Sequence, residues 1–211
     1  MECRLLIDND ALLKFSRYGL LETALQVFSC DISHVCVLHT AKYVLLPAKN
    51  RLLRCGDPVV ADCLDTFLAC STQLAVNDTN SNLIDELIAV PNIDAGEALL
   101  LAACAEDKNT FLLTGDKRCI SALASNASLA HVAERVAGRL VTLEMLLSDL
   151  IQHRFVETQE RVRANPDVDR ALTNAFGVSS PASFESVHEA LGSYIRHLRD
   201  LTGNLLYLPS S

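Results

Sequence analysis

Short apolar runs alternate with longer stretches of helical spacing through the first 150 residues. Four of these runs have the length and composition of buried strands, namely residues 3–7, 35–38, 110–114 and 140–141. The segments between them are long enough for helices. Strands that alternate with helices predict a parallel sheet in an α/β layer architecture.

Local signals mark where the helices begin and end. A polar pair precedes the first helix and Gly19 follows it, and Asp57-Pro58 is a typical helix start because proline is favoured at the first helical position. We therefore expect helices over residues 11–18, 40–55, 58–76, 95–105 and 143–151, and a polar surface loop over 77–82.

The pattern changes after residue 150. Apolar residues become sparser, charges alternate, and Asn165-Pro166 and Ser179-Ser180-Pro181 separate three helical segments, of which residues 184–201 carry an amphipathic stripe. We predict a main α/β domain over residues 1–150 and a helical C-terminal extension over 151–211.

Composition limits the class of protein. Half of the 211 residues are apolar and 21% are charged, which predicts a folded core and excludes a disordered chain. The apolar runs are far shorter than the roughly 20 residues of a membrane-spanning helix, so we expect no membrane partner. No export signal is evident, and the eight cysteines lie in apolar stretches without close pairs, which predicts a cytoplasmic protein with reduced thiols and no zinc site.

The net charge of −8 argues against nucleic-acid binding through overall charge. One segment is locally basic. Residues 32–56 contain four lysines and arginines, two histidines and no acid, so a helix there would have a positive face.

The candidate chemistry lies in carboxylates at the ends of predicted elements. Asp8 and Asp10 follow the first strand, Glu97 lies in the first turn of a helix, and Asp116 follows a later strand. Acids at strand ends are partly desolvated and repel one another unless a cation neutralises them. Oxygen ligands of this kind suit Mg²⁺ or Mn²⁺, which support phosphodiester hydrolysis.

Each acid also has a local structural interpretation. Asp10 has the position of an N-cap for the first helix, and Asp116 could cap the helix that follows it. Asp94 and Glu97 have the spacing of a capping box. These alternatives stay open at this point.

Three segments together resemble the PIN-domain nucleases, including the ribonucleases of toxin-antitoxin pairs. Residues 5–13 are similar to the opening strand motif of that family, residues 96–102 to its acid-bearing helix, and residues 111–117 to its later strand ending in Thr-x-Asp. The resemblance covers about residues 3–150. It implies a three-layer α/β/α domain with a parallel sheet of about four to five strands.

The resemblance also implies a function. Asp8, Glu97 and Asp116 fall on the family's catalytic, metal-binding acids, and Asp10 falls on a further metal position that is often Asn or Ser. The implied activity is Mg²⁺- or Mn²⁺-dependent cleavage of RNA, with an antitoxin protein or a second copy of the chain as partners.

The chain departs from the family in one place. Members often carry a further acid early in the helix after the second strand, whereas residues 39–43 contain none. Lys42 could fill that space, contact substrate phosphate, or be an ordinary surface lysine. As RNA-backbone contacts we predict Lys42, Lys49, Arg51 and Lys117, with Arg54 and Arg118 as further candidates.

Two other functions compete with the ribonuclease. Asp8-Asn9-Asp10 resembles the haloacid dehalogenase-like phosphatases, in which Asp8 would be the nucleophile. That match lacks a second acid after Asp116, between residues 117 and 126. The third candidate is a catalytically degraded PIN-like binding module that docks a partner through residues 184–201.

Overall fold

The protein is built on a sheet of five parallel strands. The computed structural model describes residues 4–28 and 30–208. The strands are β1 (Arg4–Ile7), β2 (Val35–Leu38), β3 (Thr72–Leu74), β4 (Thr110–Thr114) and β5 (Leu140–Thr142), in the order β3-β2-β1-β4-β5. All pairings are parallel, and Ile7 of the central strand lies opposite both Val37 and Leu113. The predicted parallel α/β sheet is confirmed. Cys3, placed in the first predicted strand, lies outside the described residues.

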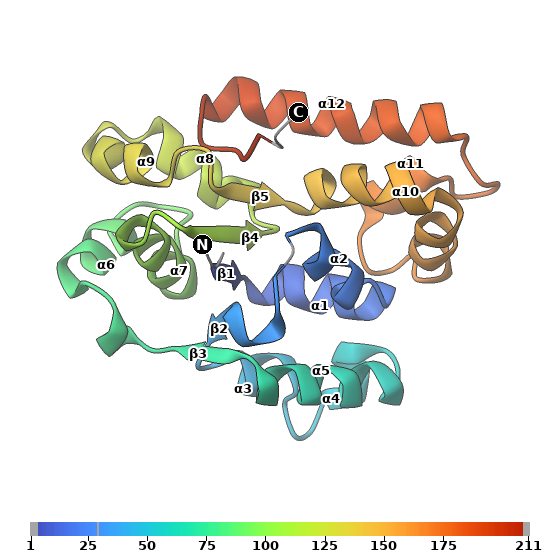
Figure 1. The fold of residues 1–211 in the computed structure, drawn as a ribbon, viewed down its shortest axis with the longest axis horizontal. Helices are drawn as coiled ribbons and strands as arrows, with labels where there is room; N and C mark the ends of the chain where they lie inside the picture. Colours follow the sequence, from blue (N-terminus) through green and yellow to red (C-terminus); the bar gives the residue numbers. More distant parts are fainter. Residues whose placement is uncertain (1–3, 29, 209–211) are drawn as a thin grey trace.

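Helices cover both faces of this sheet. Figure 1 shows α6, α7 and α9 on one side of the strands and α1, α2 and α10 on the other, which is the expected three-layer α/β/α arrangement. The helices of the first part are α1 (Asn9–Tyr18), α2 (Leu21–Val27), α3 (Ala41–Leu45), α4 (Arg51–Cys55), α5 (Pro58–Cys70), α6 (Ser81–Ile88), α7 (Ala95–Glu106), α8 (Lys117–Ser125) and α9 (Ala130–Val136). Then follow α10 (Leu143–Ala164), α11 (Arg170–Phe176) and α12 (Phe184–Thr202).

Two predicted helices differ from the structure. The helix expected over residues 40–55 is two short helices, α3 and α4, because Pro47 lies between them and cannot continue a helix. The helix expected over 58–76 ends at Cys70, and β3 follows. This strand is hard to recognise because it lies at the sheet edge and buries only Leu74.

The loop expected over residues 77–82 is also partly wrong. A 3₁₀ turn occupies Val76–Asp78, and α6 begins at Ser81. The side chain of Asn80 accepts a hydrogen bond from the backbone N–H of Asn82 and thereby caps this helix.

The C-terminal helices pack against the rest of the protein. The predicted boundary at residue 150 falls inside α10, which contacts both β5 and α12. Ion pairs join α1 to the segment before α11, with Lys14 Nζ 2.9 Å from Asp169 Oδ2 and Arg17 Nη2 2.6 Å from Asp167 Oδ2. The apolar stripe of α12 buries Val187, Leu191 and Leu198 in the same core as the sheet, so this stripe serves packing within the chain.

The chain after α12 returns to the sheet beside β5. Leu140 donates its backbone N–H to Leu205 O at 3.1 Å, and Tyr207 donates to Leu140 O at 2.8 Å. Among the described helices, none combines the length and apolar character needed to cross a membrane.

Candidate active site

Two of the predicted acids meet because their strands are neighbours. Asp8 directly follows β1, and Asp116 lies two residues after β4. The carboxyl ends of adjacent parallel strands lie at one edge of the sheet, where α/β proteins bind their ligands. The backbone N–H of Asp8 donates to Leu113 O at 2.9 Å, which fixes the two strand ends side by side.

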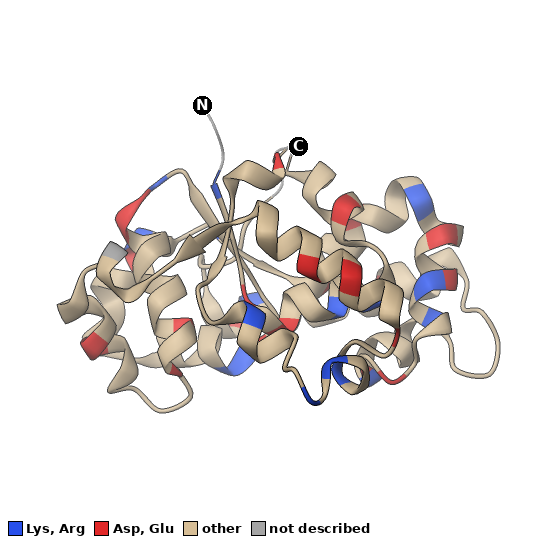
Figure 2. Ribbon diagram, turned by 90° about the horizontal axis from the view of Figure 1, so that it is seen from below, with Lys and Arg blue, Asp and Glu red and all other residues tan. Residues whose placement is uncertain are grey.

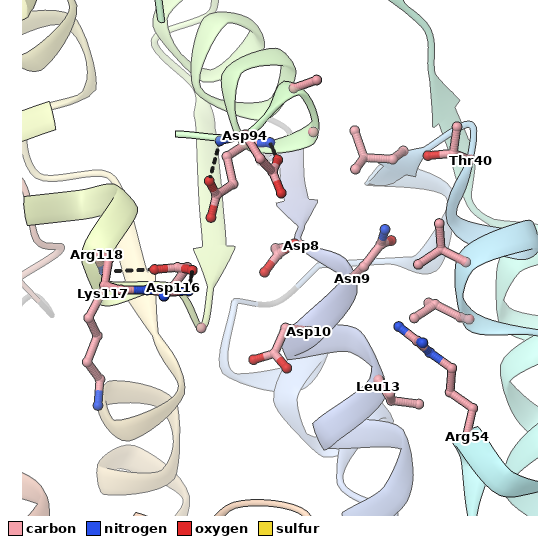
Figure 3. A pocket seen from close by; sticks show the side chains of 17 residues that line it. Asp8, Asn9, Asp10, Leu13, Thr40, Arg54, Asp94, Asp116, Lys117 and Arg118 are labelled. Carbon is pink, nitrogen blue, oxygen red and sulfur yellow. Dashed lines mark hydrogen bonds and ion pairs between the residues drawn. The ribbon is translucent and has the colours of Figure 1, made fainter. Parts of the chain in front are cut away.

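A cavity of about 890 Å³ opens at this edge, and five carboxylates line it: Asp8, Asp10, Asp94, Glu97 and Asp116. All four predicted catalytic or metal-binding residues therefore line one cavity, joined by Asp94. In Figure 3, Asp8, Asp10 and Asp116 lie around a common space from three different elements, with Asn9 and Arg54 on the side toward α3 and α4.

Asp94 and Glu97 form the capping box whose spacing the sequence contains. Glu97 N–H donates to Asp94 Oδ1, and Asp94 N–H donates to Glu97 Oε2, both at 2.8 Å. Each bond uses one carboxylate oxygen and satisfies a free N–H at the start of α7. The capping box leaves Glu97 Oε1 and Asp94 Oδ2 unused.

Asp116 is the N-cap of α8, as its position indicated. Its Oδ1 accepts from the backbone N–H groups of Arg118 (2.8 Å) and Cys119 (3.1 Å), and its Oδ2 accepts from the Arg118 guanidinium at 3.1 Å. Burial opposes the ionisation of Asp116, but these hydrogen bonds outweigh it and the pKa of the carboxyl falls below its usual value.

Asp8, and not Asp10, occupies the N-cap position of α1, so the cap predicted for Asp10 is wrong. Asp10 lies in the first turn and pairs with Lys14 at 2.8 Å. Burial, and after it the negative charge of Asp10, raises the pKa of Asp8 to about 6, although the backbone N–H groups of Asn9 and Asp10 act in the opposite direction.

Glu97 experiences the same crowding of negative charge. Burial, together with the charges of Asp94, Asp116 and Asp8, raises the pKa of Glu97 to about 7, although a backbone hydrogen bond at Asp94 acts in the opposite direction. The two raised pKa values arise from burial first and from the neighbouring carboxylates second. An added cation would relieve this repulsion.

The chemistry of the donor set fits a hard divalent cation, since five carboxylates supply oxygen ligands. Within residues 4–28 and 30–208, however, no group of three or more His, Cys, Asp or Glu side chains is arranged to hold a metal ion as it stands. Glu97 offers Oε1 without rearrangement of its cap. Asp116 Oδ2 becomes available when Arg118, whose side chain is 79% exposed, moves away.

The four residues predicted to contact RNA do not gather in one cavity as the acids do. Lys42 pairs with Asp65 at 2.9 Å, and Arg51 pairs with Asp62 at 2.8 Å, so α5 partly neutralises the basic stretch. Figure 2, which views the molecule from below Figure 1, shows acidic positions interleaved with basic ones on this side. Lys49 is exposed, and of the four predicted residues Lys117 alone lines the cavity.

Neutral side chains line the cavity beside the start of α3. Thr40 and Val44 line the cavity there, whereas Lys42 does not line it and pairs with Asp65. Sequence reasoning also missed Asn9, whose buried Oδ1 has no hydrogen-bond partner within the described part of the chain. In the sequence, the position of Asn9 between Asp8 and Asp10 was the one signal that could have identified it as a site residue.

Comparison of the chain with models of protein families, with curated proteins and with solved structures gave no match. The resemblance to PIN-domain nucleases therefore stays a prediction from the sequence.

Proposed function

We propose that the acidic cavity is the active site of a PIN-like, metal-dependent ribonuclease. The observation that carries this proposal is the convergence of five carboxylates at the carboxyl edge of a parallel sheet, with the pKa values of Asp8 and Glu97 raised to about 6 and about 7. Carboxylates that served only as helix caps would be more stable apart, because in one open cavity they repel one another.

In this proposal Asp8, Glu97 and Asp116 hold Mg²⁺ or Mn²⁺, with Asp10 beside them. When bound, such an ion supplies an activated water and neutralises charge on the phosphate oxygens. Asp94 keeps Glu97 in place through the capping box, and Asn9 lines the same cavity.

Arg118 has a second role in this proposal. Its guanidinium contacts Asp116 Oδ2 in the ligand-free protein, and a substrate phosphate can replace that carboxylate because the side chain is largely exposed. The exchange would free Asp116 at the moment substrate arrives. An antitoxin partner, a homodimer and a cytoplasmic location remain predictions from the sequence.

Cleavage of RNA tests the proposal directly. We expect the purified protein to cleave single-stranded RNA with Mn²⁺ or Mg²⁺ and to stop in excess chelator. Asp8→Asn and Asp116→Asn should abolish cleavage, whereas Asp85→Asn, at an exposed position of α6, should leave it unchanged.

Circular dichroism of each variant separates loss of activity from loss of fold. Cleavage that persists in chelator or in both active-site variants contradicts the proposal. Hydrolysis of small phosphate esters with covalent phosphorylation of Asp8 would instead identify the phosphatase.

A further inference from the structure

A second cavity lies next to the acidic one, between α8 and α12. Its volume is about 420 Å³, and it shares Lys117 and Arg118 with the acidic cavity. The other lining residues come from both helices and from the turn before α7: Asn92, Ser121, Ala122, Ser125, Tyr194, His197, Leu198 and Leu201. We call this second cavity the α8–α12 groove.

The two cavities differ in the acidic groups that line them, although Lys117 and Arg118 line both and pair with Glu144 and Asp116. Five carboxylates line the first, whereas the lining of the α8–α12 groove contains no aspartate or glutamate. It contains two permanent cations, a histidine, two serine hydroxyls and a phenol. A polyanion is repelled by the acidic cavity in the absence of metal, but the α8–α12 groove can accept its phosphates.

Lys117 is held at the junction of the two cavities. Its Nζ makes an ion pair with Glu144, whose side chain is only 7% exposed, and lies 5.3 Å from the centre of the Tyr194 ring. These contacts from α10 and α12 fix the ammonium group beside an aromatic side chain that is 36% exposed. A fixed cation next to a partly open aromatic ring suits a nucleotide, because phosphate contacts the cation and the base stacks on the ring.

We propose that the α8–α12 groove binds the single-stranded RNA segment adjoining the bond that is cleaved. Lys117 and Arg118 contact its backbone where the strand leaves the acidic cavity, His197 contacts the next phosphate, and Tyr194 stacks with a base. The C-terminal helix α12 is thus part of the substrate site. This inference rests on the proposed ribonuclease function but concerns binding, which can be measured without turnover.

Fluorescence anisotropy in excess chelator isolates this binding. The probe is a fluorescein-labelled oligouridylate of about 12 nucleotides, long enough to extend beyond one binding site. We expect Tyr194→Leu to weaken binding about tenfold, because it removes one base-stacking surface, and Tyr194→Phe to restore it.

Ser125→Glu places a negative charge in the groove at an exposed end of α8. We expect this variant to weaken binding about fivefold at low salt, with a smaller effect at high salt. Ser125→Gln controls for size. Ala69→Glu, on the exposed surface of α5 outside both cavities, adds the same charge elsewhere and should bind as the wild type does.

The outcomes separate the two proposals. If the variants weaken binding as stated but no metal-dependent cleavage occurs, the groove is supported and the ribonuclease is not. If the wild type does not bind the probe, or if Tyr194→Leu and Ser125→Glu both bind as Ala69→Glu does, the groove proposal is overturned, whatever the cleavage assay shows.

Discussion

Replacing Asp8 by asparagine should make the protein more stable while it removes the proposed metal site. The carboxyl group of Asp8 titrates at about 6 in the folded protein, against an ordinary value of 3.8. The folded state therefore binds more protons than the unfolded state between pH about 4 and pH about 6, and the free energy of unfolding of the wild type falls as the pH rises through this window.

The size of the effect follows from the shift. Roughly two pKa units correspond to about 3 kcal/mol, and because Asp8 is only partly buried we expect about 1–3 kcal/mol after solvent screening. Asp8→Asn lacks the charge, so its advantage over the wild type should be complete above pH about 6 and absent below pH about 4.

Urea unfolding followed by circular dichroism at pH 4 and pH 7, in chelator, measures this difference. The control is Asp85→Asn, which should change stability by less than about 0.5 kcal/mol at either pH. In a parallel measurement without chelator, Mg²⁺ at about ten times its dissociation constant should stabilise the wild type by about 1.4 kcal/mol and Asp8→Asn by less. Equal or lower stability of Asp8→Asn at pH 7 would refute the idea that burial and neighbouring charges destabilise the ionised Asp8 carboxylate.

Three further substitutions test the packing that positions the site. Arg139→Met should lower the free energy of unfolding by about 3 kcal/mol in urea titration, because the buried guanidinium Nη1 donates to Cys104 O, Asp107 O and Thr110 O. Gly177→Ala should cost at least about 2 kcal/mol by thermal unfolding, since φ is +96° and the added Cβ would clash with the backbone oxygen of Ser180. Lys14→Met should cost about 1–2 kcal/mol, because it leaves Asp10 and Asp169 unpaired, and high salt should reduce that loss.

The buried strands could be predicted because each is an apolar run. The residues of β2 and β4 are those expected, and β5 differs by one residue. The edge strand β3 could not be predicted in this way, because Thr72 and Gln73 are exposed and give no apolar pattern. Its position is determined by pairing with β2, a long-range contact that local sequence does not encode.

The sequence could predict that the carboxylates lie close together, but it could predict only some of the hydrogen bonds and ion pairs around the site. Asp8 and Asp116 meet because two parallel strands end together, and the capping box was visible in the spacing of Asp94 and Glu97. The partners of Lys42 and Lys117 depend on the packing of α5 and α10, so no local pattern could identify them. For the same reason the α8–α12 groove was not predicted.

The segment that follows α12 has a consequence for how the protein is made. Residues 204–207 bond to Gly138 and Leu140 and so cover the outer side of β5. During translation every strand emerges from the ribosome before this segment does. A nascent chain halted before residue 204 would carry a bare sheet edge able to pair with another polypeptide, so ribosome stalling or premature termination there should favour aggregation.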